Sequence, residues 1–142
     1  MANYYMTKTP DLKKLVDDWL AFARENLLYA RQGMKADFAP YHTICFLCQG
    51  SAEKYLKAYL ISEGWELKKI HDLDELLETA VKLDNDFAEL FPSAEILNEY
   101  ITEGRYPGDL PYEAIGKDDA EEAIAAAEKI EEFVLGKIKS AS

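Results

Sequence analysis

Two loops predicted from the sequence carry the residues best suited to bind a phosphate group. The loop before the last predicted helix contains Arg105 with two tyrosines, Tyr106 and Tyr112. The planar guanidinium of arginine matches the geometry of a phosphate, and aromatic rings stack on nucleotide bases. The turn between the second and third predicted helices adds two lysines and a histidine. The candidate phosphate- or nucleotide-binding residues are therefore Arg105, Tyr106, Tyr112, Lys68, Lys69 and His71.

Each of these residues also has a structural alternative. His71 directly precedes a helix start, where its ring could satisfy the backbone. Lys68–Lys69 could be ordinary solvated charges. Arg105 could pair with Glu103 or with a carboxylate of the last helix. Tyr106 precedes a proline, which biases it away from helical geometry and suits a sharp exit from the helix. Only the convergence of these residues at one place would favour a functional interpretation.

The helical pattern predicts that this convergence occurs. Helices joined by short connections pack as antiparallel neighbours, so alternate loops lie at the same end of an up-and-down bundle. In that topology the turn containing His71 and the loop containing Arg105 share one end with the N-terminus. A strongly acidic chain would thus collect its cations beside aromatic rings.

Apolar residues recur at three- and four-residue steps along most of the chain, which is typical of amphipathic helices. No segment shows the period-two alternation of a strand. The chain is therefore predicted to be all-α, an up-and-down bundle of four to five helices forming a single domain over residues 1–142, with its core at about 10–139. Helix starts are predicted at Thr9-Pro10, Tyr41, Asp72, Ser93 and Asp118, and helix ends near Gly33, Ser62, Gly104 and Lys139.

The composition excludes several classes of protein. With 49% hydrophobic and 30% charged residues, the chain has the profile of a folded domain. Its net charge of −11 disfavours broad, nonspecific wrapping of nucleic acid, but it leaves room for a local basic pocket. No apolar run approaches the ~20 residues needed to cross a bilayer, and no secretory signal precedes the first helix. We therefore expect a cytoplasmic protein.

The two cysteines superficially suggest a zinc site, because they form a His-x-x-Cys-x-x-Cys pattern with His42. On a helix, however, positions six residues apart lie about 120° apart and about 9 Å along the axis. Three such side chains do not readily converge on one metal, and no further cluster supplies a fourth ligand. Cys45 and Cys48 are better interpreted as free thiols in the core. We expect neither a metal nor a cofactor.

Several segments, taken in order, resemble the HEPN domain family, over roughly Trp19 to Val134. No single segment is specific, whereas the ordered set at these separations is fairly specific. The matching segments are Trp19-Leu20 with Ala23 and Leu27-Leu28, Gln49 to Ala58, His71-Asp72-Leu73 with Leu76-Leu77, Arg105-Tyr106-Pro107, and Asp119-Ala120 with Ala123.

The resemblance implies a helical bundle that commonly forms a homodimer. Many prokaryotic proteins of this kind are encoded beside a minimal nucleotidyltransferase and act with it, often as toxin and antitoxin. Active members are metal-independent ribonucleases that use an arginine and, after four to six intervening residues, a histidine. A base, an acid and a rigid cation are the groups that RNA cleavage requires.

Here the sequence departs from the ribonuclease pattern. No histidine follows Arg105; Tyr112 lies at the outer edge of the required spacing, and a tyrosine with a pKa near 10 is a poor base at neutral pH. The resemblance therefore favours a non-catalytic nucleotide- or RNA-binding module that acts as a homodimer, with a nucleotidyltransferase as a candidate partner. Two alternatives stay open: a ribonuclease that uses Arg105 with His71 or Tyr112, and a purely structural interaction protein.

Dimer formation is a separate expectation. Tyr4, Tyr5, Trp65 and the nine tyrosines overall supply more amphipathic aromatic surface than a monomer of this length needs. Such residues are enriched in protein interfaces.

Overall fold

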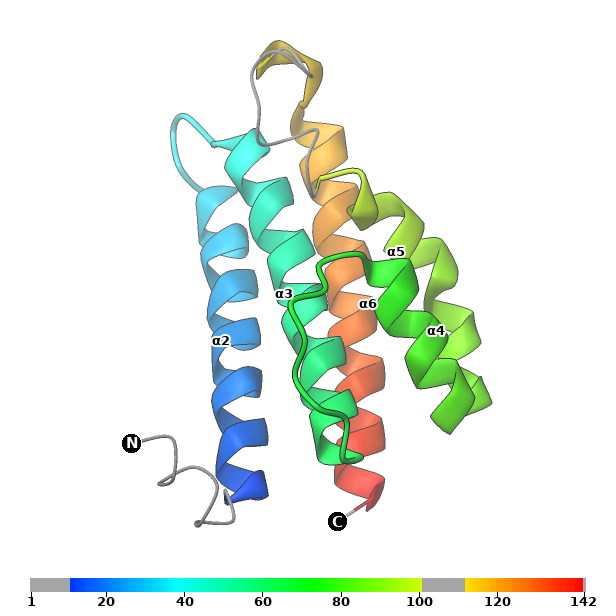
Figure 1. The fold of residues 1–142 in the computed structure, drawn as a ribbon. Coiled ribbons are helices and arrows are strands. Elements are labelled where there is room, and N and C mark those ends of the chain that lie inside the picture. Colours follow the sequence, from blue (N-terminus) through cyan, green and yellow to red (C-terminus); the bar gives the residue numbers. More distant parts are fainter. Residues whose placement is uncertain (1–10, 101–111, 142) are drawn as a thin grey trace.

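The computed structural model describes residues 11–100 and 112–141, and all regular structure in them is helical. This confirms the all-α bundle. Figure 1 shows how the elements are arranged. These are α2 (Leu12–Gly33), α3 (Tyr41–Ser62), α4 (Leu73–Leu83), α5 (Phe91–Asn98) and α6 (Lys117–Ala141), with two short 3₁₀ helices, η1 (Asn85–Leu90) and η2 (Tyr112–Ala114).

Helix α3 is the centre of the bundle. It packs antiparallel to α2 on one side and beside α6 on another, with α4 and α5 covering a third (Figure 1). Every residue from Ser51 to Ile61 is buried except Lys54. The Ser51 hydroxyl donates to the carbonyl of Ala23 at 2.8 Å, which brings α2 and α3 close together. A helix that is buried nearly all round must also bury whatever charged residues it carries.

Helix boundaries follow local capping chemistry. Asp72 begins α4 as predicted, because its carboxylate accepts from the backbone N–H groups of Asp74 and Glu75. Gly64 follows α3 with a φ of 91°, the left-handed conformation that glycine adopts most readily. The bounds predicted for the second helix, Tyr41 to Ser62, are confirmed.

Two predicted helix starts are wrong. The N-cap of α2 is Asp11, whose carboxylate accepts from the backbone N–H of Lys14, and not Thr9, which lies outside the described residues. Ser93 does not restart a helix, since it lies inside α5 and is buried. Pro92 instead occupies the first turn of that helix, where its missing N–H removes no intrahelical bond.

The direction predicted for the third helix is also wrong. The connection from Glu63 to Asp72 does not make a tight turn but runs back along the front of α3, so α4 starts beside the middle of α3 (Figure 1). Helix α4 then runs toward the end at which α3 stops, η1 and α5 return, and α6 starts at the end at which α2 stops. Among the described residues, no helix is both long and apolar enough to span a membrane.

Candidate functional site

A row of polar side chains lies on the otherwise apolar helix α3. Gln49, Glu53 and Lys57 are spaced four residues apart, so they lie one above the other on a single face. Glu53 is only 8% exposed and Lys57 only 3%. Buried charges are rare unless they are paired, which makes this row the most unusual polar feature of the described core.

The two buried charges neutralise each other. The Lys57 ammonium donates to Oε2 of Glu53 at 2.9 Å, and its Nζ also lies 5.7 Å from the centre of the Trp19 ring on α2. Burial by itself raises the pKa of the Glu53 carboxyl. The hydrogen bond and charge of Lys57 outweigh that effect, with help from His71 and Gln49, so the pKa of Glu53 is lower than its ordinary value. Glu53 is therefore a buried carboxylate at neutral pH.

His71 completes the cluster from the connection in front of α3. Its Nδ1 lies 3.0 Å from the same Oε2 atom of Glu53, and its backbone carbonyl accepts from Nε2 of Gln49 at 3.2 Å. The imidazole side chain is 54% exposed. When Nδ1 carries the proton and donates to Glu53, Nε2 is the basic nitrogen that remains available to solvent or to a ligand. We call Gln49, Glu53, Lys57 and His71 the α3 polar cluster.

The other predicted site residues that the structure describes are Lys68, Lys69 and Tyr112. Lys68 and Lys69 are exposed on the same connection and make no ion pair within the described ranges. The backbone of Tyr112 lies in η2, next to the start of α6 and at the opposite end of the bundle from Trp65, where the connection begins (Figure 1). The connection folds back along α3, so its residues do not all lie at one end of the bundle (Figure 1). The convergence of the six candidate residues at one site stays a prediction.

Arg105 and Tyr106 lie outside the described residues, so their part in a site stays a prediction. The structural alternative for His71 takes an unexpected form. Its ring does not cap α4, because Asp72 does so; the ring binds Glu53 instead.

The comparisons with known proteins agree with this architecture. The model of the HEPN domain matches residues 16–138. The chain belongs to the HEPN family. A crystal structure of an archaeal HEPN homologue is 34% identical in sequence and covers 87% of this chain and 97% of its own, with a TM-score of 0.71. The crystal structure of TT1696 from Thermus thermophilus is 30% identical and covers 86% of this chain and 97% of its own, with a TM-score of 0.73. No curated protein matches the chain.

Sequence reasoning about this HEPN domain missed Gln49, Glu53 and Lys57 as site residues, although they lie in the segment that carries the resemblance. A signal was present. The three residues repeat at four-residue steps through a helix whose other positions are mostly apolar, which favours their burial together. An acid and a base at that spacing on a buried helix indicate an internal ion pair.

The cysteines are confirmed as free thiols in the core of the HEPN domain. Cys45 and Cys48 are both fully buried. Burial raises the pKa of Cys45 to about 11 and that of Cys48 to about 12, so both stay protonated at neutral pH. The described residues hold no group of three or more metal-ligating side chains.

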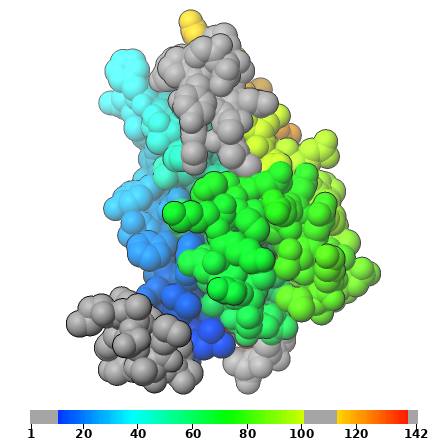
Figure 2. Space-filling model, viewed as in Figure 1, coloured from blue at the N-terminus to red at the C-terminus, as the bar shows by residue number. Residues whose placement is uncertain are grey.

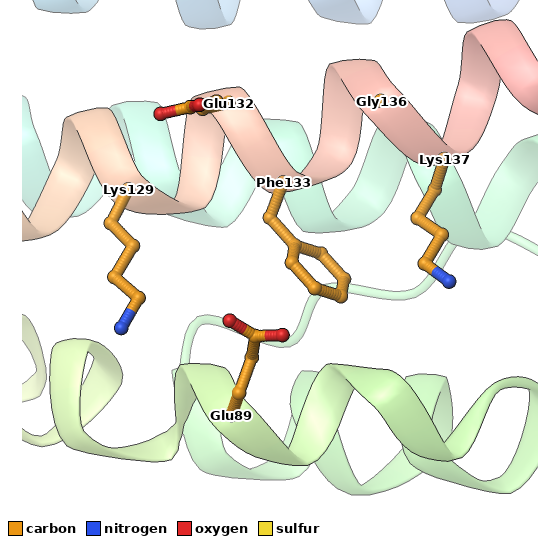
Figure 3. A pocket seen from close by; sticks show the side chains of 6 residues that line it. All are labelled: Glu89, Lys129, Glu132, Phe133, Gly136 and Lys137. Atoms are coloured by element: carbon orange, nitrogen blue, oxygen red, sulfur yellow. The ribbon is translucent and has the colours of Figure 1, made fainter.

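A separate cavity of about 500 Å³ lies between α6 and η1. Figure 3 shows Phe133 at its centre, with Lys129 on one side, Lys137 on the other, and Glu89 facing them. Lys137 pairs with Asp84 and Asp86 at 2.8 Å each, which ties α6 to the start of η1. The mixture of acidic and basic residues gives this cavity no preference for an anion, so we do not assign it to phosphate.

Proposed function

We propose that this HEPN protein is a nucleotide- or RNA-binding module that acts as a homodimer and does not catalyse RNA cleavage. One observation carries the proposal: in a chain whose net charge is −11, the half-exposed His71 binds Glu53 of α3, and Lys54, the next residue on α3, is half-buried and makes no ion pair with a described residue. Lys57 and Glu53 cancel each other's charge, which leaves Lys54 and His71 to face a ligand. A phosphate is the ligand that such a local cationic surface favours.

Binding can be measured directly. Isothermal titration of the purified protein with nucleoside mono- and triphosphates, and with short single-stranded RNA, should give saturable heats at low ionic strength. His71→Ala should weaken that binding several-fold, whereas Lys82→Gln, at an exposed lysine on α4, should not. If neither nucleotides nor RNA produce a binding signal, the proposal fails.

A second candidate function is a metal-independent ribonuclease that uses Arg105 with His71 or Tyr112. The contact between His71 Nδ1 and Glu53 favours His71 over Tyr112, because a carboxylate that orients an imidazole leaves Nε2 ready to take a proton. Incubation with RNA in EDTA decides between the two functions. If the wild-type protein cleaves RNA and both Arg105→Ala and His71→Ala abolish the cleavage, the protein is a ribonuclease and the non-catalytic binding function is wrong. Background cleavage that is equal in all three proteins would exclude the ribonuclease.

The homodimer has a candidate surface at the end of the bundle where α2 begins. Leu12, Leu15 and Leu67 are exposed there, beside Trp65, around a groove of about 340 Å³. A second copy would cover this apolar surface, in keeping with the aromatic and apolar character of interfaces. Light scattering should give a mass of about twice 16.1 kDa, and Leu15→Glu should reduce it. Leu83→Glu, which alters an exposed leucine on α4, should leave the dimer intact.

A minimal nucleotidyltransferase is the protein partner we propose, on the strength of the resemblance described above. Co-expression of the HEPN protein with a minimal nucleotidyltransferase, followed by size-exclusion chromatography, tests that pairing. A purely structural role is the remaining alternative. It would be favoured if the protein dimerises but binds neither nucleotide, RNA nor a nucleotidyltransferase.

A further inference from the structure

Two hydrogen-bond donors lie close together where α2 and α3 make their nearest approach. A Cβ atom placed on Gly50 of α3 would lie 2.8 Å from Nδ2 of Asn26 on α2 and 3.4 Å from Nζ of Lys54. The two nitrogens are therefore near neighbours, since both lie within hydrogen-bonding range of one point. The absence of a side chain at Gly50 leaves the space that they share.

Within the described part of the chain, neither donor is used. Asn26 and Lys54 are half-buried, yet no hydrogen bond or ion pair joins either side chain to another described residue. The carboxylate of Glu53, the next residue on α3, acts on Lys54 through its charge, but its oxygens bind Lys57, His71 and Gln49. Burial lowers the pKa of Lys54; the charge of Glu53 opposes that effect and the charge of Lys57 adds to it, so the pKa stays below its ordinary value. A partly dehydrated ammonium that no described carboxylate contacts directly is suited to bind an anion.

Aromatic rings flank the pair of donors along α2. Phe22 lies one turn before Asn26 and Tyr29 nearly one turn after it, so all three project from the same side of the helix. Phe22 is 58% exposed and Tyr29 is 55% exposed, which is unusual for large aromatic residues in a folded domain. Bases stack on such rings without sequence preference, while a neighbouring cation holds the backbone.

We propose that Asn26 and Lys54 bind a phosphate of single-stranded RNA over Gly50, with bases stacked on Phe22 and Tyr29. This inference rests on the proposed function and names the residues at which the RNA binds. The RNA would follow α2 on the face where α2 and the connection that carries His71 lie side by side (Figure 2). The His71 imidazole would then be available to a neighbouring phosphate on the other side of the buried Glu53–Lys57 pair.

The test is fluorescence anisotropy with a labelled ten-nucleotide oligoadenylate, measured in EDTA over a range of salt concentrations. Lys54→Gln should weaken binding about tenfold, the equivalent of one charge-assisted hydrogen bond. It should also lower the slope of log affinity against log salt by about 0.7, as expected for one phosphate contact on a single strand. The matched control is Lys82→Gln, which removes the same charge from α4 and should change neither quantity.

Two further variants test whether RNA binding depends on this site or only on the overall charge of the protein. Gly50→Ala keeps every charge, but its methyl group would displace the Asn26 amide; it should weaken binding without lowering the stability, because alanine favours a helix more than glycine does. Phe22→Leu keeps an apolar side chain but loses the stacking face, and should weaken RNA binding several-fold.

The outcomes are distinguishable. If the wild-type protein binds no RNA, the proposed function fails together with this site. If it binds RNA and the Lys54, Gly50 and Phe22 variants bind equally well, only this site is wrong. If Lys54→Gln instead turns a dimer into a monomer while RNA affinity is unchanged, the surface is a contact between two copies, and the inference is overturned. Binding of AMP as tight as binding of the oligomer would overturn the assignment to single-stranded RNA.

Discussion

One carboxylate oxygen, Oε2 of Glu53, binds both the Lys57 ammonium, at 2.9 Å, and the His71 imidazole, at 3.0 Å. Because the lysine is buried and the histidine is half-exposed, the buried ion pair supports a side chain at the surface. Gln49 adds to this support by binding the other oxygen of Glu53 and the backbone carbonyl of His71. The helix that forms the core thereby also fixes the histidine of the candidate site.

Breaking the buried pair should strongly destabilise the fold. Glu53→Gln leaves the Lys57 ammonium buried without a counterion, and we expect a loss of about 3 kcal/mol in the free energy of unfolding. Urea denaturation measures the change. The double variant Glu53→Gln/Lys57→Met should recover most of the loss, because it removes both charges from the interior. Asp17→Asn, which breaks the exposed pair between Lys13 and Asp17, should change stability by less than about 1 kcal/mol. Equal effects of Glu53→Gln and Asp17→Asn would contradict the structure.

The same carboxylate should make stability depend on pH. The folded protein lowers the pKa of Glu53 below its unfolded value of about 4.3, so this contribution is fully present above that pH. It is lost as the pH falls through the folded pKa, where Glu53 takes up a proton. The difference in unfolding free energy between wild type and Glu53→Gln should therefore be largest near pH 7 and shrink below pH 4. A difference that stays constant between pH 7 and pH 3 would argue against an ionised Glu53.

The cysteines give a prediction about reactivity. Because burial raises the pKa of both thiols, Cys45 and Cys48 should react with a thiol-specific reagent at pH 8 far more slowly than a free cysteine does. In concentrated urea both should react at the ordinary rate, which serves as the control. Rapid modification of the native protein would mean that α3 opens locally or that the thiols are not buried.

Much of this fold could be predicted from the sequence because its signals are local. The start and end of α3 and the start of α4 follow from Gly64, from the Asp72 cap and from the period of the apolar residues. These features depend on residues within a few positions of one another, so they can be predicted without knowledge of the rest of the chain.

The path of the connection could not be predicted, because contacts distant in sequence determine it. The Gln49 side chain binds the carbonyl of His71, 22 positions away, and the His71 ring binds Glu53. The rule that short connections join antiparallel neighbours contains no such information. The residue type alone therefore could not place His71 beside Glu53, and its role in a site stays a prediction. Its true neighbours had been interpreted only as part of a helix.

The overall composition gives no indication of the RNA site proposed above. The chain carries 27 acidic and 16 basic residues, and the overall charge gives no indication of a cationic surface. That surface exists because packing places Lys54 beside Asn26 and leaves both donors unused by their described neighbours. The spacing of Phe22, Asn26 and Tyr29 was visible in the sequence, but their exposure was not.

The most direct test of the central claim, that this HEPN domain binds RNA over α2 and the α3 polar cluster, is a titration followed by two-dimensional ¹H–¹⁵N NMR. Unlabelled oligoadenylate would be added to the ¹⁵N-labelled protein. The structure predicts that, among the residues it describes, the amide signals that shift will cluster at 22–29 on α2, at 50–57 on α3 and at 68–71. Shifts confined to the cavity between α6 and η1, or no shifts at all, would contradict the account.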